Sequence, residues 1–285
     1  MEIKRIGNYF QIDERGYLVN NCDIQNNQNH WLEVIEAVKD IYLTTWQDNI
    51  HSIYLRGSIS QGIAIDYVSD VDSFAILKPG FESTNILDRA KVEAWATESE
   101  TQLQAKFPFI TGLEVGLVLF ESIEDKNNIY NFTIEVQATC IYGDDLASQI
   151  DPYKINHEIA FQTKYIHFHL EQFWSEYPNE TEEEKKLWLN WLMRRFLRLG
   201  IEFVMQDEQR YTRDLYLCYE SFAKHYPQQA EQMYFALELA INPKTNEEVI
   251  TFARDFGDWL VNEASKKLHY WGYKRNKERY WLITN

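Results

Sequence analysis

The segment Leu55–Asp72, LRGSISQGIAIDYVSDVD, decides the fold expected for the first half of the chain. An apolar run over 51–55 leads into Gly57 and Ser58, and a second run over 71–77 begins just after Asp70. Short apolar runs bounded by Gly, Ser and Asp are typical of strands that end in turns. We therefore expect two strands, joined through a Gly-Ser turn and a short helix over 58–65.

Asp70 and Asp72 indicate a cation-binding site in this segment. Residues two apart in an extended chain project to the same face, so the two carboxylates are expected side by side. Such a pair repels itself unless a cation lies between the carboxylates, and Mg²⁺ prefers these oxygens together with those of a substrate phosphate. Gly57 permits close approach of that phosphate, and Ser58 can bind it. The alternative is an ordinary turn followed by solubilising charges on an edge strand.

The pattern resembles the nucleotidyltransferase superfamily of the DNA polymerase beta type. That superfamily places an apolar strand before Gly-Gly or Gly-Ser, and Asp-x-Asp before a second apolar strand; here the segments are 53–58 and 69–77. Ser-Asp-x-Asp, a later Leu-Glu-Val segment and a helical C-terminal half most resemble the aminoglycoside adenylyltransferases of streptomycin and spectinomycin. The motifs that carry the resemblance lie within residues 1–150, and the remainder matches only in outline.

The resemblance implies roles for particular residues. Asp70 and Asp72 would hold Mg²⁺, and Gly57, Ser58 and Ser69 would contact the nucleotide. Glu114, within Leu113-Glu114-Val115, would act as base on the acceptor hydroxyl from a strand beside the Asp-x-Asp strand. A solvent-facing charge on an edge strand is the alternative for Glu114. Glu135 is a weaker competitor, since it is expected on a solvated strand face.

Further candidates lie outside the core motif. Asp145, in Tyr-Gly-Asp-Asp-Leu, would contact the nucleotide or simply cap a turn. Arg213 stands where the related enzymes have a phosphate-binding lysine at a helix start, or is a surface arginine. A polar stripe on the helix over 181–205 could bind triphosphate or pair with acids of neighbouring helices; it comprises Asn190, Arg194, Arg195, Arg198 and Glu202. The acids at 182–184 cap a helix or bind a cationic acceptor.

The expected fold class is α+β. A nucleotidyltransferase domain over 1–150 should contain a mixed sheet with helices, and an all-helical bundle should follow over 151–285. In the first half we expect a hairpin over 8–20, helices over 30–47 and 87–106, and strands over 113–120 and 136–142. In the second half we expect helices over 155–174, 181–205, 212–225, 228–241 and 246–268.

Composition narrows the class of protein. The chain has 285 residues, 45% of them hydrophobic, and a formal net charge of −16. No apolar segment has the length of a membrane span or the form of a signal peptide, so we expect a cytoplasmic protein. Cys22, Cys140 and Cys218 lack metal-ligand spacing. The negative charge disfavours nucleic acid and suits a cationic acceptor, although solubility alone also explains it.

These observations predict an ATP-binding, Mg²⁺-dependent nucleotidyltransferase. It would move AMP from ATP to a hydroxyl of a small, cationic, aminoglycoside-like acceptor, releasing pyrophosphate and supporting antibiotic resistance. One alternative is a protein-modifying (AMPylating) enzyme of the antitoxin type, and another is a non-catalytic nucleotide-binding module. The length of the chain weighs against the first, and intact Asp70, Asp72 and Glu114 weigh against the second.

Overall fold

The computed structural model describes residues 3–81, 89–124 and 128–273, which form two compact units. Residues 18–153 make up the first, here called the sheet unit, and residues 3–17 with 154–273 make up the second, the helical unit. The N-terminal segment joins the helical unit through hydrogen bonds such as Phe10 N–H to the Tyr211 carbonyl, 2.8 Å. A functional division at residue 150 stays a prediction.

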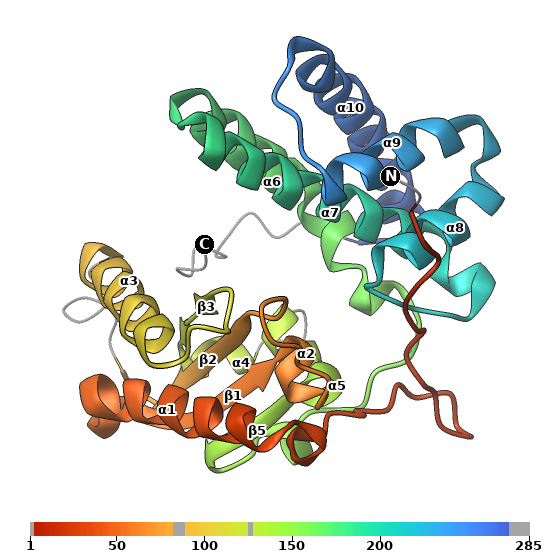
Figure 1. Cartoon of the computed structure of the whole chain (residues 1–285). Coiled ribbons are helices and arrows are strands. Elements are labelled where there is room, and N and C mark those ends of the chain that lie inside the picture. Colours follow the sequence, from red (N-terminus) through yellow and green to blue (C-terminus); the bar gives the residue numbers. More distant parts are fainter. Residues whose placement is uncertain (1–2, 82–88, 125–127, 274–285) are drawn as a thin grey trace. The chain divides into compact units, whose positions relative to one another are not determined.

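The sheet unit contains a mixed sheet in the order β3-β2-β1-β5, with β4 also paired to β2 (Figure 1). Its central strands β1 and β2 are antiparallel, β1 and β5 are antiparallel, and β2 is parallel to β3 and β4. The strands are β1 (Ile50–Arg56), β2 (Val71–Leu77), β3 (Leu113–Glu114), β4 (Leu117–Val118) and β5 (Ala138–Gly143). The predicted mixed sheet with helices is therefore confirmed.

Helices cover both faces of this sheet. On one face, Ile53, Leu55 and Val71 pack in a core with Trp31 and Val38 of the first helix. On the other face, Tyr54, Phe74 and Ile76 pack with Ile134. The helices of the unit are α1 (Asn29–Trp46), α2 (Gly57–Ser60), α3 (Arg89–Lys106), α4 (Phe120–Ile123) and α5 (Ile129–Gln137). Burial on both faces explains why β1 and β2 read as nearly continuous apolar runs.

The helical unit consists of helices that follow the expected order. They are α6 (Phe161–Glu176), α7 (Glu182–Glu208), α8 (Leu215–His225), α9 (Ala230–Ile241) and α10 (Glu247–Tyr270). At the start of α7, the Thr181 hydroxyl accepts the Glu184 N–H and the Glu184 carboxylate accepts the Thr181 N–H. This is the predicted capping box. None of the helices within the described residues is long and apolar enough to cross a membrane.

Five local expectations were wrong. The helix expected over 155–174 begins only at Phe161. The N-terminal segment forms a turn at Asp13–Gly16, where the Asp13 N–H donates to the Tyr17 carbonyl at 2.8 Å, but the expected strands over 8–20 are not formed; Tyr17 also pairs with Lys154. The short helix after the turn ends at Ser60, not 65. The strand over 113–120 is broken into β3 and β4. Residues 129–137 are helical, so Glu135 lies on α5 and not on a strand face. The expected start of α3 at residue 87 lies outside the described residues.

Candidate active site

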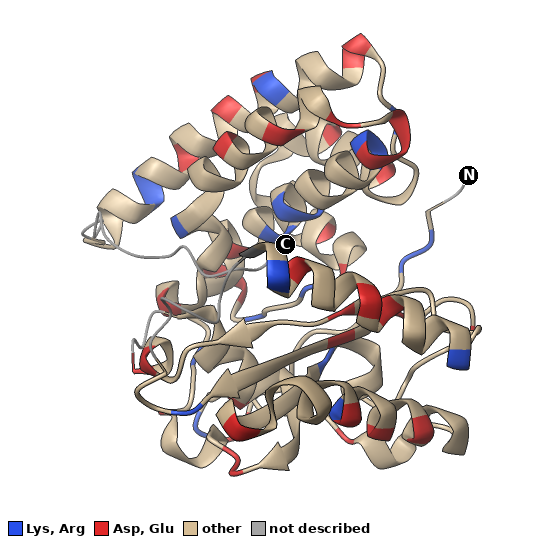
Figure 2. Ribbon diagram, turned by 90° about the vertical axis from the view of Figure 1, so that its left-hand side faces the viewer, with Lys and Arg blue, Asp and Glu red and all other residues tan. Residues whose placement is uncertain are grey.

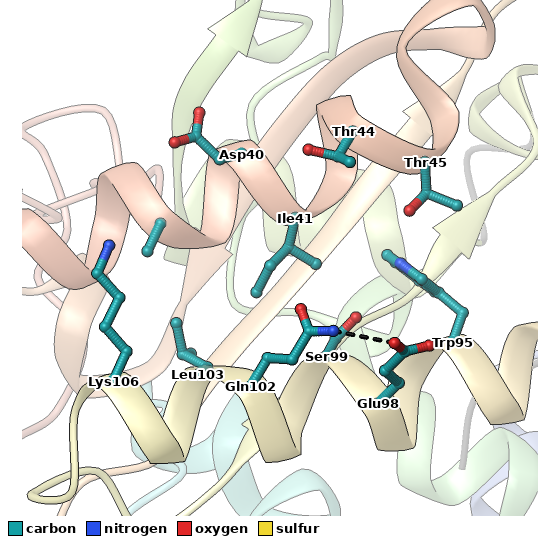
Figure 3. A pocket seen from close by; sticks show the side chains of 11 residues that line it. Asp40, Ile41, Thr44, Thr45, Trp95, Glu98, Ser99, Gln102, Leu103 and Lys106 are labelled. Carbon is teal, nitrogen blue, oxygen red and sulfur yellow. Dashed lines mark hydrogen bonds between the residues drawn. The ribbon is translucent and has the colours of Figure 1, made fainter.

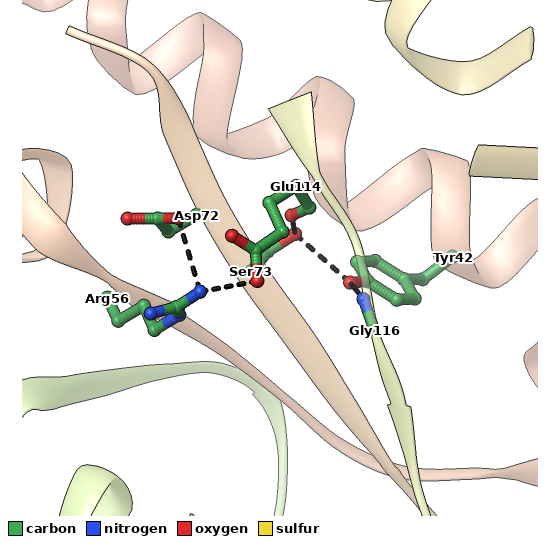
Figure 4. A network of polar contacts seen from close by, with 6 residues as sticks. All are labelled: Tyr42, Arg56, Asp72, Ser73, Glu114 and Gly116. Atoms are coloured by element: carbon green, nitrogen blue, oxygen red, sulfur yellow. Dashed lines mark hydrogen bonds and ion pairs between the residues drawn. The ribbon is translucent and has the colours of Figure 1, made fainter. Parts of the chain in front are cut away.

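The site is built where β1, β2 and β3 come into register. Arg56, the last residue of β1, pairs with Asp72 of β2, and Asp72 pairs in turn with Glu114 of β3. The Arg56 Nη2 lies 3.3 Å from Asp72 Oδ1 and 2.5 Å from Glu114 Oε1 (Figure 4). The sheet therefore brings the two predicted carboxylates together, with a guanidinium between them.

Gly57 follows Arg56, and its backbone lies close to the Asp72 side chain. Its φ is +78°, a conformation that residues with a Cβ rarely adopt. A Cβ built at this position would lie 2.7 Å from Asp72 Oδ2. Glycine is thus required twice here, by its own backbone and by the neighbouring carboxylate.

Ser58 and Ser69 connect the Gly-Ser turn to the start of β2. The Ser58 hydroxyl donates to Ser69 Oγ at 3.0 Å, and Ser69 Oγ also accepts the Ile65 N–H at 3.0 Å. Ser69 is 7% exposed. The two hydroxyls predicted to contact a nucleotide therefore lie together, and they also fix the geometry of the turn.

Asp70 lies directly before β2 in extended pairing. Hydrogen bonds on either side of it, Thr111 N–H to the Ser69 carbonyl and Val71 N–H to the Gly112 carbonyl, continue the parallel ladder across this residue. Asp70 is exposed, whereas Val71 between the two aspartates is fully buried. An alternating pattern of this kind favours the expected placement of Asp70 and Asp72 on one side of the strand.

Glu114 is held by its backbone and has a perturbed carboxyl group. The Ser73 hydroxyl donates to the Glu114 carbonyl at 2.9 Å, and the Tyr42 hydroxyl lies 3.0 Å from Ser73 Oγ (Figure 4). Burial raises the pKa of Glu114, and Arg56 opposes this effect while Asp72 reinforces it. The side chain is only partly buried, with 48% of it exposed, so its carboxyl is accessible to a proton donor that approaches from solvent.

The donor chemistry of the aspartates fits Mg²⁺. This ion is commonly held by one or two carboxylates together with substrate phosphates, and Asp70 and Asp72 provide such a pair. Within residues 3–81, 89–124 and 128–273 there is no cluster of three or more His, Cys, Asp or Glu side chains that could hold a metal ion. A metal at this site would therefore depend on oxygens from a bound substrate.

Asp145 lies away from this group. It follows β5, which runs antiparallel to β1, so that Gly143 pairs with Ser52 while Ala138 pairs with Arg56. Asp145 Oδ1 accepts the Ala147 N–H at 3.0 Å and the Tyr54 hydroxyl at 3.2 Å. The structure places it in a turn at the opposite end of β1, and we do not include it in the proposed site.

Glu135 does not belong to the three strands that carry the site, although it lies three residues before Ala138, which pairs with Arg56. It lies on α5, where burial raises its pKa to about 7. Its Oε2 is buried and has no hydrogen-bond partner among the described residues. The prediction of a solvated strand residue was wrong for Glu135, and the position beside Asp72 belongs to Glu114.

The stripe predicted on α7 has two kinds of member. Asn190 donates to the Ala240 carbonyl at 2.6 Å, and Glu202, 1% exposed, accepts the N–H groups of Gln162 and Thr163. Both residues therefore serve the packing of the helical unit. The acids at the start of α7 serve the helix as well, since Glu184 forms the capping box and Glu182 binds Lys185 and Thr245.

The arginines of the same helix form a cluster of positive charge. Burial, with Arg213 and Arg194 nearby, lowers the pKa of Arg198 to about 9. In the described parts of the chain, no carboxylate lies within ion-pair distance of Arg194 or Arg198. Arg213 precedes the N-cap of α8. Arg195 instead stacks on Trp191, 3.5 Å from the ring centroid. Arg194 is exposed to solvent, whereas the Nε of Arg198 is buried and has no hydrogen-bond partner among the described residues, so an anion suits Arg198.

Sequence reasoning missed Arg56. The residue was visible directly before Gly57, but its contacts depend on the register of three strands. A cation at the end of a buried strand, next to a glycine turn, is the signal that could have identified it.

A pocket of about 400 Å³ lies elsewhere in the sheet unit, between α1 and α3 (Figure 3). Ile41 and Trp95 contribute apolar surface, and Asp40, Glu98 and Lys106 contribute charges. None of the predicted site residues lines it. The pocket therefore gives no support to the site at the strand ends.

Comparison with known proteins finds similarity to solved structures. No protein-family model matches the chain, and no curated protein matches it. Among solved structures, spectinomycin adenyltransferase AAD(9) from Enterococcus faecialis, solved with ATP and spectinomycin, is similar with a TM-score of 0.47 and 13% identity. The match covers 82% of this chain and 99% of that chain. A TM-score below 0.5 establishes neither the fold family nor the activity of this chain.

Proposed function

We propose that the protein is a nucleotidyltransferase that moves AMP from ATP to a hydroxyl of a small acceptor, with Mg²⁺ as the cofactor. The observation that carries this proposal is the register that aligns Arg56, Asp72 and Glu114 beside Gly57. It unites a close backbone approach, a carboxylate pair and a third carboxyl of raised pKa. Nucleotidyl transfer needs these parts together: a phosphate cradle, cation ligands and a base.

Each residue has a defined task in the proposed reaction. Gly57, Ser58 and Ser69 cradle the phosphates, and Asp70 and Asp72 hold Mg²⁺. When bound, Mg²⁺ supplies charge neutralisation and orientation of the triphosphate. The acceptor oxygen attacks the α-phosphorus, the bond to the bridging oxygen of the β-phosphate breaks, and pyrophosphate leaves. Glu114 takes the proton from the acceptor hydroxyl.

Arg56 affects the charge interaction between the Asp72 and Glu114 carboxylates, both of which it contacts. Its guanidinium faces both Asp72 and Glu114, so it reduces their mutual repulsion while no other cation is present. The same contact opposes protonation of Glu114. Arg56 is therefore proposed as a positioning residue for the base.

The arginines of the helical unit support a polyanionic substrate. Arg198 is a mostly buried cation, and neither it nor Arg194 has a carboxylate partner in the described residues. A buried charge without a partner is unfavourable until an anion binds it. We propose that Arg194, Arg198 and Arg213 bind an anionic ligand such as a phosphate group.

The proposed acceptor is a polycationic aminocyclitol such as streptomycin, and the activity would confer resistance to it. Asp and Glu are spread along the helices of both units (Figure 2), and the net charge is −16. A field of this sign concentrates cationic ligands.

A turnover screen tests the proposal. The purified protein is incubated with each nucleoside triphosphate, Mg²⁺ and a panel of aminoglycosides, and pyrophosphate release is measured. We expect release with ATP that depends on the acceptor. Labelling of a protein partner from radioactive ATP, with no small molecule modified, would replace this proposal with the antitoxin type. Nucleotide binding without turnover of any acceptor would indicate a non-catalytic module.

A further inference from the structure

The loop between α2 and β2 exposes an unusual amount of apolar surface. Ile63, Ile65, Tyr67 and Val68 are 61%, 60%, 74% and 68% exposed, respectively. We call these four residues the apolar loop (between α2 and β2 in Figure 1). Single exposed apolar residues are common, but four large ones within residues 63–68 of one loop make this loop a candidate binding surface.

This loop is held in place by its backbone. The Ile63 N–H donates to the Ser58 carbonyl at 3.0 Å, and the Tyr67 N–H donates to the Phe109 carbonyl at 2.6 Å. Between them, the Asp66 carboxylate accepts the Trp31 indole N–H at 2.9 Å. These bonds tie the loop to α1 and to the segment before β3. The apolar side chains are therefore presented to solvent by a fixed backbone.

Tyr67 has the least favourable backbone of the loop. Its φ is +62°, a left-handed conformation that is uncommon for residues other than glycine, Asn and Asp. Strain of this kind persists only where the surrounding structure imposes it, and it gathers at ligand sites. Here it accompanies a tyrosine ring that is 74% exposed.

The loop is joined directly to the proposed phosphate site. It begins after the Gly-Ser turn and ends at Ser69 and Asp70. Ser69 Oγ binds both the Ser58 hydroxyl of the turn and the Ile65 N–H of the loop, each at 3.0 Å. The phosphate cradle and the apolar loop thus form one continuous, hydrogen-bonded surface.

We propose that the apolar loop binds the base of the nucleotide, with Tyr67 as the stacking residue. This inference rests on the proposed function. A nucleoside triphosphate carries one planar aromatic group, its base, whose faces can stack and which a ribose connects to the phosphates. An exposed aromatic ring stacks on such a group, and Ile65 and Val68 add apolar surface beside it.

Calorimetric titration with two probes tests the inference, both in the presence of Mg²⁺. ATP contains the base, whereas inorganic tripolyphosphate contains only the phosphates. Tyr67→Asn removes the ring, and Asn tolerates the left-handed backbone, so this variant keeps the loop conformation. Tyr67→Phe retains the ring. Tyr270→Ala removes a comparably exposed tyrosine, 84% exposed, from the helical unit and serves as the control.

We expect Tyr67→Asn to weaken ATP binding roughly tenfold, the scale of one stacked base, and to leave tripolyphosphate binding unchanged. Tyr67→Phe and Tyr270→Ala should bind both probes as the wild type does. Unchanged ATP affinity in Tyr67→Asn would overturn the inference and leave the proposed function standing. An altered oligomeric state with unchanged affinity would overturn it in favour of a protein contact. If the wild type binds neither probe, the proposed function falls and the inference falls with it.

Discussion

At the residue scale, Gly57 shows most clearly how the backbone shapes the site. Gly57 and Gly80 both have positive φ, +78° and +75°, but only Gly57 has a neighbour that a Cβ would meet, Asp72 Oδ2 at 2.7 Å. We expect Gly80→Ala to lower the unfolding free energy by about 1 kcal/mol, and Gly57→Ala to lower it by at least as much, because its Cβ also meets Asp72. Gly57→Ala alone should also abolish ATP binding, because it displaces Asp72. Urea unfolding and ATP titration of the two variants measure both effects, and equal ATP affinity in the two would contradict this role for Gly57.

Glu114 should affect turnover more than binding. If it takes the acceptor proton, Glu114→Gln reduces turnover roughly a hundredfold or more and leaves ATP affinity nearly unchanged. Glu98→Gln, an exposed position on α3, is the matched control. The measurements are pyrophosphate release and ATP titration. A parallel collapse of ATP·Mg²⁺ affinity would show that Glu114 is a metal ligand and not the base.

At the element scale, a buried carboxylate of α7 caps α6. Glu202 accepts the Gln162 N–H at 3.0 Å and the Thr163 N–H at 2.7 Å, and burial raises its pKa to about 7. Because the folded state raises the pKa above its ordinary value, folding favours the protonated form. The resulting stabilisation is complete below the ordinary pKa of glutamate and is lost as pH rises through about 7.

The pH dependence that Glu202 causes can be measured as the difference in unfolding free energy between the wild type and Glu202→Gln. Glu202→Gln does not titrate, so the wild type should lose up to about 3 kcal/mol relative to this variant between pH 4.5 and pH 8. Urea unfolding at both pH values checks this, and the other acids cancel in the comparison. A constant difference across this range would show that Glu202 does not titrate as its burial predicts.

The elements also show what sequence could predict. The end of β1 could be predicted because Gly57 and Ser58 follow it. The start of β2 could be predicted because Asp70 and Asp72 mark it. Helix α5 was missed because Ile129, Thr133, Ile134 and Val136 have β-branched side chains, and packing overrode that preference. The available signal was Asn128, whose side chain caps the helix by accepting the Tyr130 N–H.

The candidate site, like the fold, was predictable where local motifs define it and not where strand pairing does. Asp70, Asp72 and Glu114 follow from local motifs, whereas Arg56 and Asp145 depend on how strands pair. No local pattern shows that β5 runs antiparallel to β1, and that direction carries Asp145 to the far end of β1. Strand order and register are tertiary properties, so these two residues could not be assigned from spacing alone.

At the scale of the whole molecule, net charge governs the approach of the acceptor. A chain with a net charge of −16 attracts a polycation over a distance that dissolved salt shortens. We expect streptomycin to raise the melting temperature, and its apparent affinity to fall as ionic strength rises from low to high. Thermal-shift titrations at two salt concentrations measure this. A neutral sugar alcohol is the control, and an affinity for streptomycin that is independent of salt would contradict an electrostatic attraction.

The central claim is that the aspartate pair binds ATP through Mg²⁺, and calorimetric titration with ATP, with and without Mg²⁺, tests it most directly. Asp72→Asn should fold normally, since Arg56 keeps its contact with Glu114. Asp48→Asn is the control, an exposed aspartate just before the start of β1. The account predicts Mg²⁺-dependent ATP binding in the wild type and Asp48→Asn, and its loss in Asp72→Asn. Wild-type affinity for ATP·Mg²⁺ in Asp72→Asn would contradict it.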